Sequence, residues 1–298
     1  MDNKLYHKSV MVNEVLEYLN PLPGEVYIDA TFGAGGHTRA ILQAEPTCQV
    51  IAIDVDKDAI DINSIDLKEE YKDRFSIFWG NFINITQFLK SKGIDKVAGI
   101  LADFGTSQFQ IKNKPGFSFN IETDLDMRMS PSHSRITAYD IVNKSQEIEL
   151  ADIFYKFGQE FNSRKIAKAI VNYRKEIGPI KTTTQLAKLV ESVVYKKTNS
   201  RSNIHAATKV FQALRIVTNN ELNSIKSLLA QSINLLKENG SLVCISFHSL
   251  EDVLVKQFFK DNKEYFQVLT NKVITAKDSE IAENKSSRSA KLRAGLRN

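Results

Sequence analysis

Aspartates close short apolar or β-prone runs at several places in this chain. Asp54 follows residues 49–53, Asp103 follows residues 97–102, and Asp29 also follows such a run. Apolar runs of this length are typical of strands in a parallel sheet that is covered on both faces. The carboxyl ends of such strands meet at one edge of the sheet, where cofactors bind. We therefore expect Asp54 and Asp103 to place their carboxylates in a binding or catalytic crevice.

A glycine-rich turn follows the first of these runs. Residues 26–28 are β-prone, Gly33, Gly35 and Gly36 form the turn, and a helix-compatible segment begins at His37. A strand that returns as a helix brings backbone N–H groups and the positive end of a helix dipole to one point, which favours a nucleotide-type cofactor. The alternative is an ordinary tight turn whose glycines serve only to permit positive φ.

The spacing narrows the choice of cofactor. The dinucleotide fingerprint needs a third small residue where this chain has Thr38, so that fingerprint is not met. Asp54 follows Gly35 at about the twenty-residue spacing of the carboxylate that binds ribose hydroxyls in such folds. S-adenosylmethionine and NAD both carry an adenosine ribose, so Asp54 alone does not distinguish them. The missing third glycine favours S-adenosylmethionine, which has no pyrophosphate.

The composition is that of an ordinary soluble globular protein. The chain has 298 residues, 42% hydrophobic and 25% charged, which allows one core and an insertion. Its two cysteines, Cys48 and Cys244, suit a reducing cytosol. Charged residues interrupt the apolar runs of the N-terminus, so we expect a cytoplasmic protein with neither signal peptide nor membrane span. No cluster has metal-ligand spacing, so we predict no metal.

Apolar periodicity predicts an α/β core in which strands and helices alternate. The predicted strands are residues 26–28, 49–53, 75–79, 97–102, 241–246 and 266–273. The predicted helices of this core are residues 10–19, 57–67, 83–92 and 250–260. Between the fourth and fifth strands the alternation stops, and residues 148–213 show helical patterns only. The sequence therefore predicts a doubly wound core, residues 1–108 and 214–298, with a mostly helical insertion, residues 109–213.

Basic side chains concentrate in the insertion and in the C-terminal tail. Residues 164–215 contain twelve Lys or Arg but only two acidic residues, Glu176 and Glu191, and residues 285–297 contain five basic residues and no acidic one. Clustered positive charge with interleaved aromatic residues is typical of nucleic-acid binders, which is the interpretation we favour. The alternative is a solvated helix face whose counter-charges lie elsewhere in the fold.

Nine motifs occur together in a fixed order. They are DATFGAGGHT (29–38), AIDVDKDAI (52–60), GNF (80–82), ILADFGTSQFQ (100–110), GFSF (116–119), LDMRM (125–129), ALRIVTNNEL (213–222), ISFHSLED (245–252) and SSRSAKLR (286–293). From residue 7 to the C-terminus, the chain strongly resembles the bacterial RsmH (MraW) methyltransferase family. The resemblance implies a Rossmann-like S-adenosylmethionine-dependent methyltransferase fold with an RNA-recognition insertion. It also implies methylation of N4 of a cytosine in the P-site part of the decoding centre of 16S ribosomal RNA, within the 30S subunit.

The same resemblance implies contacts with S-adenosylmethionine at matching positions. Gly35, Gly36 and His37 would form the loop against its methionine part. Asp54 would bind the ribose hydroxyls, and Phe82 would lie beside the adenine. A general-base role for His37 is less favoured, since the positive end of a helix dipole opposes protonation of an imidazole.

Asp103 and Gln110 would line the passage from cofactor to substrate, again by resemblance. The lone pair of a cytosine N4 amine is delocalised into the ring, so an enzyme must hold the amine with hydrogen-bond acceptors and remove a proton. Asp103 is our candidate acceptor, and the competing role, equally weighted, is cofactor binding alone.

The target base must leave its stack to reach the methyl group. Phe104, Phe109, Phe117 and Phe119 are candidates to stack on it, or they pack the insertion against the core. The pattern around residue 249 predicts that Ser249 caps the following helix, although nearby His248 could face the substrate.

The sequence also allows two other functions. The fold could carry an NAD-dependent oxidoreductase, against which Thr38 and the basic insertion argue. It could also serve as a scaffold for a non-catalytic RNA-binding or ribosome-assembly protein, against which the full set of cofactor-site residues argues. The sequence leaves the oligomeric state open, with a homodimer as one option.

Overall fold

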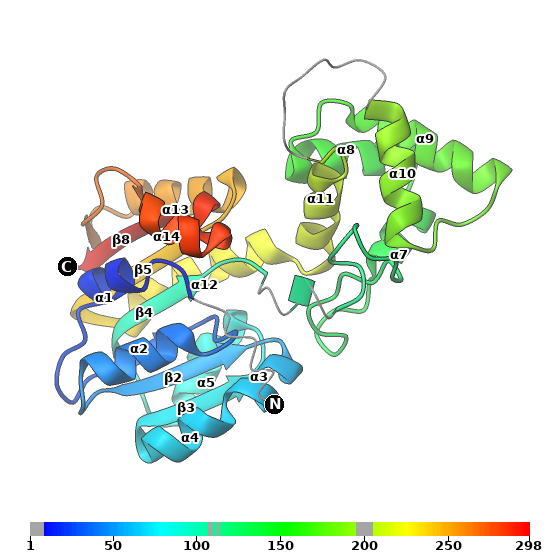
Figure 1. The fold of residues 1–298 in the computed structure, drawn as a ribbon. Coiled ribbons are helices and arrows are strands. Elements are labelled where there is room, and N and C mark those ends of the chain that lie inside the picture. The colour runs from blue at the N-terminus through cyan, green and yellow to red at the C-terminus, as the bar shows by residue number, and fades with distance from the viewer. Residues whose placement is uncertain (1–8, 107–109, 112–113, 195–204) are drawn as a thin grey trace. The chain divides into compact units, whose positions relative to one another are not determined.

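Figure 1 shows the computed structural model of the chain, which describes residues 9–106, 110–111, 114–194 and 205–298. The contacts between residues divide the chain into two compact units. The first comprises residues 1–107 and 222–298, and the second comprises residues 108–221. The second unit is therefore an insertion in the sequence of the first.

An eight-stranded sheet forms the centre of the first unit. Its strands are β1 (Val26–Asp29), β2 (Gln49–Asp54), β3 (Phe75–Trp79), β4 (Val97–Asp103), β5 (Leu236–Ser246), β6 (Phe266–Val268), β7 (Ile274–Thr275) and β8 (Lys291–Arg297). The strand order is β3-β2-β1-β4-β5-β8-β6, and β7 pairs with β8. Strands β1 to β5 are parallel to their neighbours among these five, and the order reverses between β1 and β4. This confirms the predicted doubly wound core and places its ligand-binding switch point at the carboxyl ends of β1 and β4.

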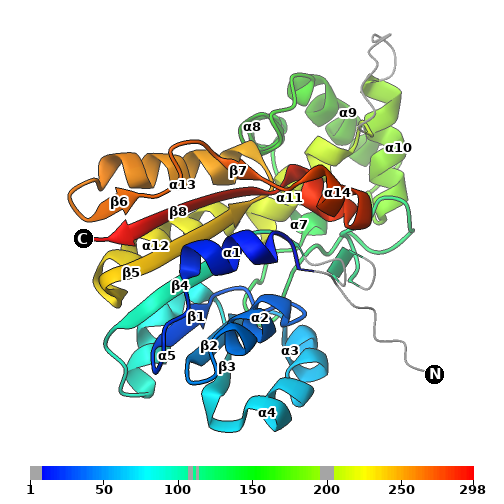
Figure 2. The ribbon, with the colours of Figure 1, turned by 60° about the vertical axis from the view of Figure 1, so that its left-hand side comes forward.

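Helices cover both faces of this sheet. One apolar cluster joins it to α1 (Val12–Leu19), α2 (Gly36–Ala44) and α4 (Ile65–Tyr71), and Figure 2 shows α1 and α2 drawn across the sheet. The other cluster joins it to α5 (Ile85–Ser91), α12 (Glu221–Leu235) and α13 (Ser249–Asp261). Because both faces are covered, the central strands need to be apolar almost throughout, as the sequence showed.

The remaining helices of the first unit are short. They are α3 (Lys57–Asn63), α14 (Asp278–Glu283) and the 3-10 turns Lys72–Arg74, Phe82–Asn84 and Lys285–Ser289. The single helix predicted for residues 57–67 is wrong, because the chain turns at Ser64, which is buried and ends α3 as α4 begins. None of the helices in the described part of the chain combines the length and the apolar character that crossing a bilayer requires.

The C-terminal tail corrects a second prediction. Residues 291–297 form β8, which lies antiparallel between β5 and β6, and the strand predicted for residues 266–273 is confined to the short β6. Arg293 Nε donates to Asp252 Oδ1 at 2.7 Å, and Arg297 Nε donates to the carbonyl of Ile233 at 3.0 Å. Arg293 and Arg297 therefore stabilise the first unit. The positive charge of the tail is thus not explained by nucleic-acid binding alone.

The second unit is helical, as predicted. Its helices are α7 (Ala138–Lys144), α8 (Glu147–Gly158), α9 (Ser163–Glu176), α10 (Thr183–Val194) and α11 (Thr208–Thr218). Leu150, Phe154, Ile166 and Leu214 belong to a buried cluster of its own. The boundary expected between residues 213 and 214 falls inside α11, so the observed division differs there.

We predict that Arg293→Ala lowers the free energy of unfolding of the first unit by about 2 kcal/mol, because it leaves the Asp252 carboxylate, 13% exposed, without its ion-pair partner. Urea denaturation followed by Trp79 fluorescence reports this unit, since Trp79 ends β3 and is the chain's single tryptophan. Arg288→Ala, at an exposed position of the same tail, should be nearly neutral. Equal stability of the Arg293 variant and the wild type would contradict this role of β8.

Candidate active site

The turn between β1 and α2 is built on glycine conformations. Gly33 and Gly35 have φ values of 53° and 76°, in the left-handed region that favours glycine. A Cβ on Gly35 would lie 2.7 Å from Leu67 Cδ1 and 2.9 Å from the Phe32 ring, so this residue must be glycine for close packing as well. Among the residues that the structure describes, none has a heavy atom within 4 Å of a Cβ on Gly33, so they leave that side of the turn open.

The carboxylate of Asp54 lies directly against this turn. Its Oδ2 accepts a hydrogen bond from the Gly33 N–H at 2.7 Å, and its Oδ1 accepts one from the Asp56 N–H at 2.8 Å. Burial raises the pKa of Asp54 to about 6, while these two hydrogen bonds lower it. At neutral pH the group is therefore mostly ionised and can accept further hydrogen bonds.

A second aspartate anchors the turn from inside. Asp29, which is fully buried, accepts hydrogen bonds from the Thr31 N–H at 3.1 Å and from Thr38 Oγ1 at 2.7 Å. Burial raises its pKa, and the hydrogen bonds oppose that shift. Thr38, which occupies the third-glycine position of the dinucleotide pattern, is therefore a structural partner of Asp29.

His37 is fixed between two elements and is only 4% exposed. Its Nε2 lies 2.8 Å from the carbonyl oxygen of Val10, which can only accept, so Nε2 carries a proton. Its Nδ1 lies 3.8 Å from Asp103 Oδ2. The side chain thus faces the end of β4, while its backbone N–H lies in the first turn of α2, where N–H groups have no partner within the helix.

Asp103 has the most unusual environment of the predicted residues. Burial raises its pKa to about 7, Asp29 and Glu251 add to this rise, and His37 opposes it. Its backbone N–H donates to Thr31 Oγ1 at 2.7 Å, which fixes the end of β4 against β1. Its Oδ1 is buried and has no hydrogen-bond partner among the residues that the structure describes. Buried polar atoms are normally satisfied, so this oxygen marks a position where a ligand donor fits.

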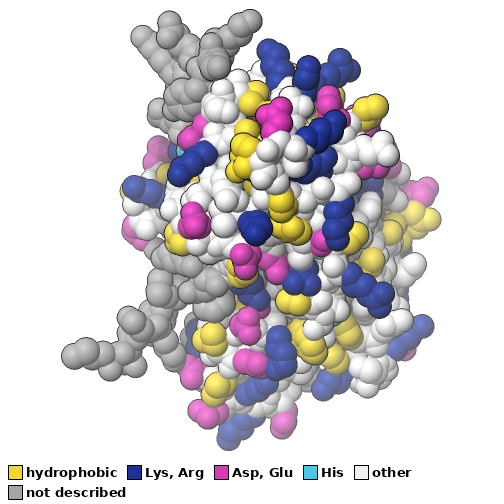
Figure 3. Space-filling model, turned by 90° about the vertical axis from the view of Figure 1, so that its right-hand side faces the viewer, with side chains coloured by type: hydrophobic (Ala, Val, Ile, Leu, Met, Phe, Trp, Pro, Cys, Tyr) yellow, Lys and Arg dark blue, Asp and Glu magenta, His cyan; other side chains and the backbone are white. Residues whose placement is uncertain are grey.

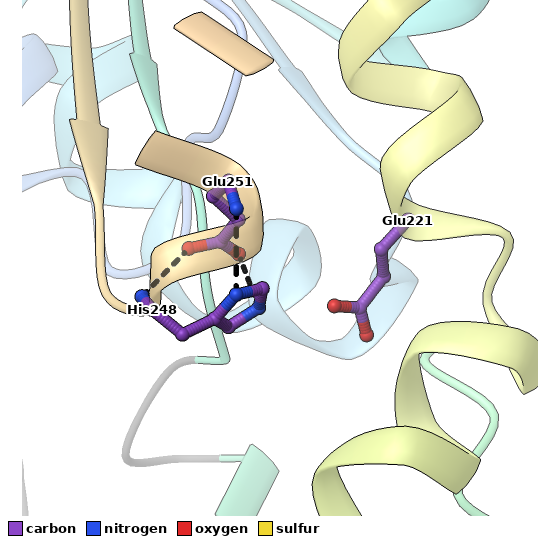
Figure 4. Close-up of side chains that lie close together, drawn as sticks. All are labelled: Glu221, His248 and Glu251. Atoms are coloured by element: carbon purple, nitrogen blue, oxygen red, sulfur yellow. Dashed lines mark hydrogen bonds and ion pairs between the residues drawn. The ribbon is translucent and has the colours of Figure 1, made fainter. Parts of the chain in front are cut away.

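The start of α13 corrects the capping prediction. His248, not Ser249, is the N-cap residue, and Glu251 completes the capping box. Figure 4 shows the two side chains together: Glu251 Oε1 lies 3.2 Å from His248 Nε2. Glu221, also drawn there, is the first residue of α12, and it pairs with Arg215 of α11 at 2.9 Å.

The contacts of His248 with Glu251 therefore stabilise the start of α13. Glu251 is 1% exposed, and its Oε2 accepts a hydrogen bond from the Phe247 N–H at 2.7 Å. Asp252, one residue further along α13, pairs with Arg293.

The aromatic candidates for base stacking separate into different environments. Phe104 is 3% exposed and packs in the core, 6.3 Å from the half-buried Phe82 between ring centroids. Phe119 stacks on the His205 ring at 4.4 Å within the second unit. Phe104 therefore packs within the first unit and Phe119 within the second. Phe109 lies outside the described residues.

The two remaining candidates for cofactor contacts, Phe82 and Gln110, lie in different units of the chain. Phe82 begins the 3-10 turn after β3, at the same edge of the sheet as Asp54. Gln110 is buried and belongs to the second unit, so its role in a passage stays a prediction. Sequence reasoning missed Thr31 and the Val10 carbonyl, which fix Asp103 and His37; a threonine inside a turn and a backbone carbonyl give no chemical signal in the sequence.

A doubly wound sheet with a glycine turn and strand-end carboxylates at its switch point defines a Rossmann-like fold of the methyltransferase type. A family model described as the MraW methylase family matches residues 4–297, and the chain belongs to this family.

Relatives named ribosomal RNA small subunit methyltransferase H are similar over nearly their whole length. The one from Sulfurihydrogenibium sp. (strain YO3AOP1) is 46% identical over 293 residues, covering 98% of this chain and 99% of the relative. The one from Wolbachia sp. subsp. Drosophila simulans (strain wRi) is 44% identical, covering 97% and 98%. Among solved structures, an rRNA methylase from Streptococcus thermophilus aligns with a TM-score of 0.47 at 9% identity, covering 97% of each chain.

We predict that Thr38→Val lowers the free energy of unfolding by roughly 1–3 kcal/mol, because it removes a hydroxyl donor from a fully buried carboxylate without changing side-chain volume much. Thr38→Ser keeps the hydroxyl and should recover most of this loss. The measurement is urea denaturation of both variants. If the valine variant were as stable as the serine variant, the Thr38–Asp29 hydrogen bond would contribute nothing to the turn.

Proposed function

We propose that this protein methylates N4 of a cytosine in the P-site part of the decoding centre of 16S ribosomal RNA, in the cytoplasm. Membership of the methylase family, with relatives named ribosomal RNA small subunit methyltransferase H, supports the coarser activity: S-adenosylmethionine-dependent methylation of small-subunit ribosomal RNA. The observation that carries the finer proposal is the Oδ1 of Asp103 at the switch point of the sheet, which is buried and accepts no hydrogen bond from the described residues, since an exocyclic amine is a donor that fits it.

The glycine turn and the strand ends fit S-adenosylmethionine. The open side of Gly33 leaves room beside Asp54, whose ionised carboxylate would accept hydrogen bonds from the two ribose hydroxyls. The first N–H groups of α2, at Gly36 and His37, have no partner within the helix and would bind the methionine carboxylate.

The other predicted contacts complete this assignment. Gly35 would keep the backbone close enough for the methionine part, and Phe82 would lie beside the adenine. Asp103 and Gln110 would line the side that faces the substrate.

When bound, S-adenosylmethionine supplies an electrophilic methyl group on a sulfonium. The chain's own task is to hold the cytosine amine in line with that group, because in-line displacement depends chiefly on positioning. In the ionised form, Asp103 Oδ1 would accept a hydrogen bond from the amine and favour a pyramidal nitrogen. As the new N–C bond forms, the nitrogen becomes more acidic, and its proton would pass to the Asp103 carboxylate.

The environment of Asp103 suits that transfer. A carboxylate with a pKa of about 7 is a stronger base than an ordinary aspartate, yet it is still substantially ionised at neutral pH. His37, whose Nδ1 lies 3.8 Å from Oδ2, opposes the rise in the pKa of Asp103 and so helps to keep the carboxylate ionised before the transfer.

The pH dependence follows from the raised pKa of Asp103. Only the ionised form can accept the amine proton, so we expect the single-turnover rate to rise between pH 6 and 8 and to level off above, with an inflection near the pKa of about 7. Asp103→Asn should lower the rate roughly 100-fold or more and abolish the inflection, while Asp103→Ala should be inactive but folded. A flat profile in the wild type, or near-normal methylation by Asp103→Ala, would refute this role.

Asp54 gives a separate test of the cofactor site. We predict that Asp54→Ala weakens binding of S-adenosylmethionine about 100-fold, since two hydrogen bonds to a charged acceptor together contribute roughly 3 kcal/mol. Calorimetry with S-adenosylmethionine and with NAD measures this and distinguishes a methyltransferase from an oxidoreductase. Asp58→Ala, at an exposed position in the first turn of α3, is the matched control and should bind normally. Unchanged affinity in the Asp54 variant would exclude Asp54 as the ribose ligand.

The proposed function as a whole is tested by mass spectrometry of nucleosides from 16S ribosomal RNA of cells with and without this gene. We expect N4-methylated cytidine to decrease in the strain that lacks the gene and to return when 30S particles from that strain are incubated with the protein and S-adenosylmethionine. An unchanged nucleoside profile, with no methyl transfer to those particles, would favour a non-catalytic RNA-binding or assembly role.

A further inference from the structure

Phe161 is the most exposed of the large hydrophobic residues in the described part of the chain. It is 84% exposed and lies in the corner between α8 and α9 of the second unit. Single exposed apolar residues are common on protein surfaces, so exposure alone implies nothing. The surroundings of this phenylalanine are what distinguish it.

Hydrogen bonds and close backbone packing fix the corner that carries Phe161. Gln159 ends α8 with a φ of 52°, and the carboxylate of Glu160, only 6% exposed, accepts a hydrogen bond from the Asn162 N–H at 2.8 Å. Gly158 packs so closely on the backbone of Lys209 that a Cβ there would clash with the Lys209 carbonyl. An exposed ring is therefore presented from a fixed backbone, which lowers the entropy cost of binding to it.

A cation lies beside the ring. Lys209 Nζ is 5.4 Å from the centroid of Phe161, and it also donates a hydrogen bond to the carbonyl of Gln159 at 3.1 Å. This lysine is thus held over the aromatic side chain by the same corner, and a ligand on the ring would meet a positive charge.

Helix α9, which follows this corner, carries further positive side chains at its N-terminus. Arg164 and Lys165 lie in the first turn of α9 and Lys168 one turn later, and all three side chains are exposed. This first turn has no acidic residue, and the N-cap Asn162 makes no side-chain capping hydrogen bond. Cations at the positive end of a helix dipole are unfavourable. The Glu160 carboxylate, which accepts hydrogen bonds from Asn162 just before the helix, offsets one charge, and a bound phosphate would offset a further one.

We propose that this surface, made of Phe161, Arg164, Lys165 and Lys209, binds a single-stranded segment of the RNA substrate. A base would stack on the exposed ring, and a neighbouring phosphate would bind at the start of α9. The inference rests on the proposed function, because it takes small-subunit RNA as the ligand. Stacking on an aromatic side chain next to a basic track is how proteins bind single strands, whereas a protein partner would not need this excess of cations. Figure 3 shows one face of the molecule, on which Lys and Arg side chains lie among hydrophobic and acidic ones.

The test is binding of a fluorescently labelled single-stranded oligoribonucleotide of the decoding region, measured by anisotropy on the full chain. We expect Phe161→Ala to weaken binding about tenfold, within the range known for one stacked base, and Phe161→Trp to bind at least as well as the wild type. Ile148→Ala, which removes a 76% exposed side chain at the other end of α8, is the matched control and should bind normally. The duplex of the same sequence should not distinguish wild type from Phe161→Ala, because its bases are already stacked.

The phosphate contacts have their own signature. The double variant Arg164→Gln and Lys165→Gln should reduce the slope of log K against log salt by roughly 1.4, since each contact with a single strand contributes about 0.7. An unchanged slope would show that Arg164 and Lys165 do not contact RNA phosphates.

The outcomes separate the two proposals. If the wild type methylates 30S particles but Phe161→Ala binds the single strand as tightly as the wild type, the stacking surface is wrong and the proposed function stands. If binding depends on Phe161 but no methyl transfer occurs under any condition, the proposed function fails while the RNA-binding surface is upheld.

Discussion

The hydrogen bond from the Gly33 N–H to Asp54 Oδ2, at 2.7 Å, joins the glycine turn after β1 to the end of β2. It sets the carboxylate beside an open side of the turn, because no described residue has an atom within 4 Å of the position where a Cβ on Gly33 would be. The rest of the first unit supports this arrangement. In the parallel register of β1 with β2, Asp29 lies beside Ala52, so β2 runs two residues further and Asp54 lies beside the turn. Both apolar clusters cover the sheet that carries these strands.

A second feature of the same edge is the concentration of buried carboxylates. Asp29, Asp103 and Glu251 are close enough that Asp29 and Glu251 both raise the pKa of Asp103. Most of the rise comes from burial, and the fold satisfies Asp29 and Glu251 with hydrogen bonds while leaving one oxygen of Asp103 without a partner in the described residues. An aspartate in such a position is costly for stability, which is reasonable where the group serves chemistry.

The parallel core could be predicted from the sequence because its strands are almost wholly apolar and each ends in a polar residue. Asp54 and Asp103 were found for the same reason, whereas Phe82 and Gln110 came only from family resemblance. The tail shows the opposite case. Its five basic residues predict a nucleic-acid-binding surface, but Leu292 and Ala294, which alternate with Lys291 and Arg293, are buried in β8. The basic residues obscured the alternation of buried and more exposed side chains that is typical of a strand. The cap of α13 was misplaced by one residue because the motif for a capping box does not include a histidine.

We expect the crevice at the ends of β1, β2 and β4 to seat a methyl donor with its reactive group facing Asp103. A crystal structure of the protein with S-adenosylhomocysteine and cytidine tests this arrangement. The ribose hydroxyls should lie on the Asp54 carboxylate, and the cytidine amine should lie within hydrogen-bonding distance of Asp103 Oδ1. A ribose bound elsewhere, or an Asp103 whose Oδ1 contacts neither ligand, would refute this arrangement.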